Sequence, residues 1–162
     1  MVAFLIAGAL TITSPAFTND GNIPSKFTCD AGMQNPSPAL EWKDAPAGTK
    51  SFALIMHDPD APLAGGFTHW VLFDIPGSAK ELPEGFQVGS IGVSGNMGMR
   101  RQGWMGPCPP TGVHHYHFML SALDVETLGL QAGATKADVE KAMQGHVLGS
   151  ADMVGLYQRQ PK

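Results

Sequence analysis

Short apolar runs alternate with turn-forming residues along most of this chain. Three of these runs lie at residues 52–57, 68–75 and 116–123, and serine, proline or glycine stands close to their ends. Runs of this length and composition predict buried strands. Residues 151–157 predict a last, short strand. Strands separated by turn-rich loops indicate a mainly β fold, a sandwich of antiparallel sheets.

One helix is predicted after residue 135. Thr135 can cap it, with Asp138 three positions later in a capping-box arrangement, and apolar residues recur at helical spacing around Val139. Gly145 stands where the end of the helix is expected. Residues 87–103 show little periodicity but contain several glycines. This pattern predicts a long loop at a functional edge or a bulged strand.

The N-terminal residues leave the compartment open. Residues 2–10 form an apolar run of signal-peptide length, but they lack a basic start and a small-residue cleavage site. We interpret them as a first strand that continues into residues 11–13, since the run is too short to cross a membrane. A cytoplasmic location is expected, with the periplasm as the alternative if these residues are the remnant of an export signal.

The composition adds constraints on size and partners. A chain of 162 residues predicts a single domain spanning residues 1–162. Hydrophobic residues make up 43% and charged residues 15%, a balance typical of globular proteins. The net charge of −4 argues against nucleic acid as a partner, because such surfaces are basic. No stable insertion into a membrane is expected.

Two proline-rich segments carry the candidate chemistry. Residues 58–62 read Asp-Pro-Asp-Ala-Pro and precede His69, while residues 106–112 precede His114. Proline fixes the backbone angle φ, so these loops hold polar side chains with little freedom. Rigid loops that lead into strands are suited to a small-ligand pocket. Each segment alone also reads as an ordinary turn, and each histidine alone as a hydrogen-bonded structural residue.

Other kinds of site find less support in the sequence. On a strand, His115 and His117 share one face while His114 lies on the other, and no HExxH pattern is present. We therefore expect no metal site. The glycines of residues 89–98 match no nucleotide-binding motif, and no cofactor is expected.

The two cysteines, Cys29 and Cys108, form no CxxC motif, so they are interpreted as free buried or pocket thiols, with a disulfide as the alternative. Cys108 as a nucleophile is not favoured, because the flanking prolines indicate a rigid packed turn. No Gly-x-Ser-x-Gly elbow is present either. We therefore expect a protein that is not an enzyme, and a metal- or cysteine-dependent hydrolase is the least favoured interpretation.

Taken together, the two segments resemble the two signatures of the phosphatidylethanolamine-binding protein family. The resemblance is to its bacterial and archaeal branch, often described as kinase-inhibitor-like. Further matches lie at residues 27–30, 37–42 and 145–157, so the similarity covers nearly the whole chain. It implies a sandwich of two antiparallel β-sheets, partly Greek-key, with a few short peripheral helices. It also implies a small cavity that binds phosphate-like anions or phospholipid head groups.

The resemblance also implies roles for individual residues. Asp58 would accept an N–H from a pocket histidine, and Tyr116 would donate its hydroxyl to the anion. The Ala61–Pro62 peptide bond is a candidate cis bond. Trp104 stands where many members carry a tyrosine, and Cys108 stands where animal members carry a glycine, which narrows the pocket or gives it a thiol. The ligand-binding residues implied are Asp58, Ala61, Pro62, His69, Gly106, Cys108, Pro110, His114 and Tyr116.

The leading functional hypothesis is a module that binds a small phosphorylated or carboxylate ligand and has a regulatory role. The alternative, also implied by the resemblance, is an inhibitor that binds a protein kinase or protease through protein–protein contact. A homodimer is implied as well, because bacterial members often pair.

Overall fold

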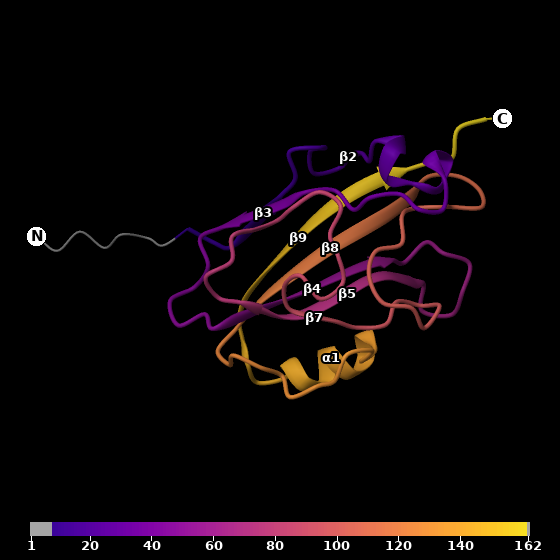
Figure 1. Ribbon diagram of the computed structural model, residues 1–162. Helices are drawn as coiled ribbons and strands as arrows, with labels where there is room; N and C mark the ends of the chain where they lie inside the picture. The colour runs from indigo at the N-terminus through magenta and orange to yellow at the C-terminus, as the bar shows by residue number, and fades with distance from the viewer. Residues whose placement is uncertain (1–7, 162) are drawn as a thin grey trace, which may run out of the picture.

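The computed structural model describes residues 8–161, and these residues form a mainly β fold (Figure 1). The predicted strand over residues 2–10 lies largely outside the described residues, and strand β1 begins at Thr11. The elements in chain order are β1 (Thr11–Thr13), β2 (Gly21–Asn22), η1 (Ser25–Phe27), η2 (Cys29–Ala31), β3 (Leu40–Lys43), β4 (Ser51–Asp58), β5 (Phe67–Pro76), β6 (Glu81–Leu82), β7 (Val93–Ser94), β8 (His114–Leu123), α1 (Lys136–Met143) and β9 (Val147–Tyr157).

The strands form two sheets, as the sequence predicts. One sheet has six strands in the order β2-β9-β8-β4-β5-β7, and the other has three in the order β1-β3-β6. The pairs are antiparallel except β2 with β9, which run parallel. Figure 1 shows β3 on one side of the large sheet and α1 on the other. The predicted fold class, a two-sheet sandwich with short peripheral helices, is confirmed.

The central strands are apolar on both faces because both faces are covered. Along β4, Phe52, Leu54 and Met56 point into the core between the sheets. Ala53 and Ile55 point to the opposite face, where they join a second cluster with Val139 of α1. Successive side chains of a strand alternate between faces, so a strand covered on both sides reads as an unbroken apolar run.

Most predicted elements are confirmed, and their ends differ. The runs at residues 52–57, 68–75 and 116–123 lie within β4, β5 and β8. Helix α1 begins after Thr135 with the predicted capping box in place. Strand β9 starts at Val147 rather than at residue 151, because pairing with β8 extends it through mostly exposed residues that include glycine and serine. Residues 87–103 are a loop except for β7 and a single bridge.

The loop after β4 turns sharply without a cis bond. The described residues contain no cis peptide bond, so the prediction of one at Ala61–Pro62 is wrong. The Leu63 N–H donates to the Ala61 carbonyl at 2.7 Å, which closes a three-residue turn around Pro62. Gly66 then returns the chain to β5 with φ +78°, and a Cβ atom there would lie 2.3 Å from the Asp58 carbonyl oxygen.

A disulfide joins Cys29 to Cys108, so the prediction of free thiols is wrong. The fold places η2 beside the second proline-rich loop, where the Cys29 N–H donates to the Pro107 carbonyl at 3.0 Å. This contact brings the two Cα atoms to 5.4 Å, within the range that disulfides require. A separation of 79 residues gave no local signal of that proximity.

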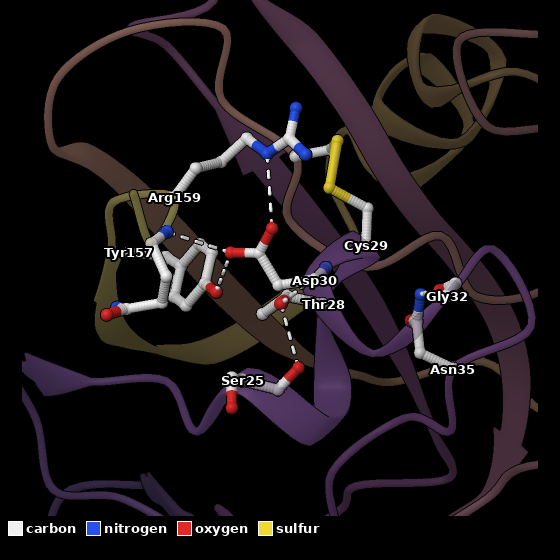
Figure 2. Close-up of polar contacts among 10 residues, drawn as sticks. Ser25, Thr28, Cys29, Asp30, Gly32, Asn35, Tyr157 and Arg159 are labelled. Atoms are coloured by element: carbon white, nitrogen blue, oxygen red, sulfur yellow. Dashed lines mark hydrogen bonds and ion pairs between the residues drawn. A yellow bond between two sulfur atoms is a disulfide. The ribbon is translucent and has the colours of Figure 1, made fainter. Parts of the chain in front are cut away.

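The residue after Cys29 binds the C-terminal segment, as Figure 2 shows. The Asp30 carboxylate accepts the Tyr157 hydroxyl at 2.5 Å and the Arg159 Nε–H at 3.2 Å. It also accepts the backbone N–H of Gln160 at 3.0 Å. These hydrogen bonds, with that from Tyr157 the largest cause, lower the pKa of Asp30. The disulfide and the end of β9 are thus held at one place.

Candidate functional site

A cavity of about 290 Å³ lies where β4 ends and where β5 and β8 begin. β4 pairs with both neighbours, so the Asp58 end of β4 meets the first residues of β5 and β8. All but one of the predicted ligand-binding residues line it. The lining residues are Asp58, Ala61, Pro62, Leu63, Phe67, His69, Met99, Met105, Cys108, Pro109, Pro110, His114 and Tyr116.

A buried Asp–His pair forms part of this lining. His114 Nδ1 lies 2.7 Å from Asp58 Oδ2, and only 6% of His114 and 2% of Asp58 is exposed. The other carboxylate oxygen accepts the Asp60 N–H at 2.9 Å. Asp58 therefore stabilises the turn and orients the His114 imidazole at the same time. The turn at residues 58–60 and the Asp–histidine contact, which the sequence suggests separately, are both present. The proton on His114 Nδ1 faces the carboxylate, which leaves Nε2 for a ligand.

His69 is a second buried imidazole, held by the backbone. Its Nδ1 donates to the Met105 carbonyl at 2.8 Å, because a carbonyl only accepts. The ring packs edge-on against Phe67 and Tyr116, with centroid distances of 4.8 and 5.2 Å. Burial is the main reason that the pKa of His69 is lowered to about 4. The ring is therefore neutral near pH 7.

Tyr116 carries a buried hydroxyl without a partner. Its side chain is fully buried, and the hydroxyl has no hydrogen-bond partner among residues 8–161. Burial raises the pKa of the phenol, so the hydroxyl keeps its proton. Buried polar groups are nearly always hydrogen-bonded, and an orphan in a cavity wall points to a group that a ligand can satisfy.

The rest of the wall is apolar, and part of it could not be predicted from the two proline-rich segments. Leu63 and Met99 stand at the mouth with 60% and 57% exposure. Within the described chain, no lysine or arginine lines the cavity. Phe67, at a loop-to-strand junction, could have been found from the same pattern as His69. Met105 had no such signal, since it acts through its backbone carbonyl.

Two residues expected near the ligand lie elsewhere. Gly106 is absent from the lining, because it packs where a Cβ would be 2.2 Å from both the Phe27 carbonyl and Asn35 Oδ1. Its lack of a side chain permits this close packing. Trp104 donates its Nε1–H to Asn35 at 2.8 Å and stacks on Phe118, outside the cavity lining.

Cys108 does line the cavity but offers no thiol, because it is bonded to Cys29. The prediction of a thiol in the pocket is therefore wrong. Of the other histidines on β8, His115 pairs with Asp60 and His117 with Asp152, each at 2.7 Å. Neither lines the cavity.

Among the described residues, no helix has the length and hydropathy needed to cross a membrane. A family model described as "Phosphatidylethanolamine-binding protein" matches residues 13–158.

Two curated relatives are similar over most of their length. A "UPF0098 protein" of Aquifex aeolicus is 47% identical, with 96% of this chain and 93% of that protein covered. A "UPF0098 protein" of Methanothermobacter thermautotrophicus is 46% identical, with 93% and 99% covered.

Two solved structures share the fold, each with a TM-score of 0.85. One is a putative phosphatidylethanolamine-binding protein homologue from Chlamydia trachomatis, 35% identical, with 94% of this chain and 99% of that chain covered. The other is the YbcL protein of Escherichia coli, described as a member of the mammalian family, 28% identical, with 94% and 100% covered.

Proposed function

This chain belongs to the phosphatidylethanolamine-binding protein family, and from that membership and the cavity we propose that it binds a small phosphorylated ligand. One observation carries the proposal. The Asp58–His114 pair and the unpartnered Tyr116 hydroxyl line the same buried cavity. The Tyr116 hydroxyl can donate to a phosphoryl oxygen, and His114 presents Nε2 to the ligand. The resemblance of the two loops to the family signatures supports the same ligand class.

The expected strength follows from the number of polar groups. Asp58 holds His114 Nδ1 and leaves Nε2 for the ligand, and Tyr116 donates its hydroxyl. Hydrogen bonds to charged groups contribute about 1.5–3 kcal/mol each. Two or three of them correspond to a dissociation constant between about millimolar and micromolar. The apolar walls suit the carbon part of the ligand.

The same cavity supports binding rather than catalysis. Its described lining contains no serine or threonine, and its cysteine is held in a disulfide. A nucleophile beside a histidine is the usual requirement for covalent hydrolysis. We therefore propose a binding protein, with regulation through its ligand as the role.

The disulfide supports the periplasmic alternative for location. Disulfides persist in oxidising compartments and are rare where thiols are kept reduced. We infer that the protein works in such a compartment. Trapping the cysteines with an alkylating reagent in intact cells tests this, and fully alkylated Cys29 and Cys108 would contradict it.

The proposed function is tested by titrating the purified protein with phosphoethanolamine and following the imidazole resonances by NMR. We expect His69 and His114 to shift together with one dissociation constant in the millimolar range or below. His117→Gln, which removes an imidazole outside the cavity, should bind equally well. No shift of either buried ring at millimolar phosphoethanolamine would overturn the proposal.

A further inference from the structure

His69 offers the cavity a fixed hydrogen-bond acceptor, beside the Tyr116 hydroxyl, which is a donor. Because Nδ1 donates to the Met105 carbonyl, the neutral ring carries its proton there and Nε2 carries a lone pair. Within residues 8–161, Nε2 has no hydrogen-bond partner. The contacts with Met105, Phe67 and Tyr116 fix the orientation of the ring, so it cannot flip without losing the Nδ1 bond.

The ring stays neutral over the pH range in which phosphate esters titrate. The charged and titratable groups that face it are His57 and Asp58 of β4 and His114 and Tyr116 of β8. Asp58 favours the protonated ring, whereas His57 and His114 disfavour it. Burial outweighs these and lowers the pKa to about 4. Nε2 therefore accepts a hydrogen bond from about pH 5 upward.

The cavity thus combines a fixed acceptor, His69 Nε2, with a donor, the Tyr116 hydroxyl. An oxyanion head that bears no proton presents only lone pairs, so one of its oxygens would meet the His69 lone pair. A head with a P–OH group donates to His69 Nε2 and accepts from the Tyr116 hydroxyl with another oxygen. Asp58 is also the one carboxylate in the described lining, with no lysine or arginine to balance a second ligand charge.

Resting on the proposed function, we propose that His69 Nε2 selects singly protonated phosphomonoesters over phosphodiesters and sulfate esters. Phosphodiesters, which include intact phospholipid head groups, have no acidic hydroxyl left at neutral pH. Sulfate esters have the same tetrahedral shape but no proton. The inferred ligand is therefore a free phosphomonoester and not a lipid still carrying its acyl chains.

The test compares three soluble ligands of one head group: phosphoethanolamine, its sulfate ester analogue and glycerophosphoethanolamine. At pH 5 the phosphomonoester is mostly singly protonated, since its second pKa is about 6. We expect it to bind at least about tenfold more tightly than either other ligand, the factor set by losing one hydrogen bond of about 1.4 kcal/mol. Between pH 5 and pH 8 this advantage should fall by about tenfold, because the monoester loses its proton while the other two ligands do not change charge.

A variant pair assigns the effect to His69. His69→Gln can rotate its amide to offer N–H, so the preference for the monoester at pH 5 should vanish. His115→Gln removes an exposed imidazole outside the cavity and should keep it. Equal affinity of the wild-type protein for the three ligands at pH 5 would overturn this inference and leave the proposed function standing. Failure of all three to shift His69 and His114 would overturn both.

Discussion

Asp58 makes a separate contact with each of its carboxylate oxygens. One accepts the Asp60 N–H in a partly buried contact, and the other accepts the His114 Nδ1–H in a buried one. We predict that Asp58→Asn weakens phosphoethanolamine binding by at least about tenfold, because the neutral amide loses the carboxylate contact that orients the His114 imidazole. The free energy of unfolding should fall by about 1–3 kcal/mol. Calorimetric titration and urea denaturation measure the two effects.

A matched control is available on the same sheet. Asp152 bonds His117 with the same geometry, but both side chains are substantially exposed. Exposed pairs contribute less than about 1 kcal/mol. Asp152→Asn should therefore leave both affinity and stability nearly unchanged. If Asp58→Asn behaved like Asp152→Asn, the buried pair would have no part in binding.

At the residue scale, the sequence identified side chains better than it identified their partners. Asp58, His69, His114 and Tyr116 were found from two motifs because rigid loops leave few places for polar groups to go. The Met105 carbonyl was not found, because every residue has a carbonyl and only the fold decides which one faces His69. The position of Gly106 outside the cavity lining could not be predicted for a related reason, since its close neighbours Phe27 and Asn35 are distant in sequence.

At the scale of elements, the β4–β5 loop depends on Gly66 more than on Gly65. Gly65 and Gly66 have φ values of +79° and +78°, so alanine is strained at either position. A Cβ at Gly65 would meet nothing within 4 Å, whereas one at Gly66 would meet the Asp58 carbonyl at 2.3 Å. We predict that Gly65→Ala costs about 1–2 kcal/mol of stability. Gly66→Ala should cost about 1–3 kcal/mol more, because the clash adds to the strain.

The same pair of variants tests whether this loop shapes the cavity. The backbone of Asp58 must move in Gly66→Ala, and the Asp58 side chain lines the cavity. Phosphoethanolamine affinity should fall in Gly66→Ala and persist in Gly65→Ala under conditions where both are folded. Similar melting temperatures for the two variants would contradict this prediction, because the loop would then accommodate the added Cβ atom at position 66 without a loss of stability.

Elements that carry their own signals were predicted well. The capping box of Thr135 and Asp138 marks the start of α1 within the sequence itself. Residues 87–103 lack such a signal, because distant partners hold them. The Asn96 N–H donates to the Ala134 carbonyl and the Gly98 N–H to the Thr68 carbonyl, and both partners are far away in the sequence. The position of loop residues such as Met99 in the cavity wall therefore cannot be predicted from neighbouring residues in the sequence.

At the scale of the whole molecule, one disulfide connects the cavity wall to the segment at residue 29, and hydrogen bonds of the next residue connect that segment to the C-terminal residues. Cys108 lines the cavity, Cys29 follows η1, and the neighbouring Asp30 binds Tyr157, Arg159 and the backbone of Gln160 (Figure 2). The pairing of the two cysteines could not be predicted from the sequence, because their proximity is a property of the complete fold. The cross-link closes a loop of 79 residues.

Breaking this bond should therefore reduce stability and binding together. A loop of this length predicts a loss of up to about 4–5 kcal/mol in the free energy of unfolding on reduction. Because Cys108 belongs to the wall, phosphoethanolamine affinity should also fall several-fold in the reduced protein that remains folded. Urea denaturation and calorimetric titration with and without a dithiol reductant measure these effects. The Cys29→Ser/Cys108→Ser double variant, which the reductant cannot alter, should match the reduced protein in both. If reduction changed neither the urea midpoint nor the dissociation constant, the disulfide would contribute neither to stability nor to the cavity. The inference that the protein needs an oxidising compartment would then lose its support.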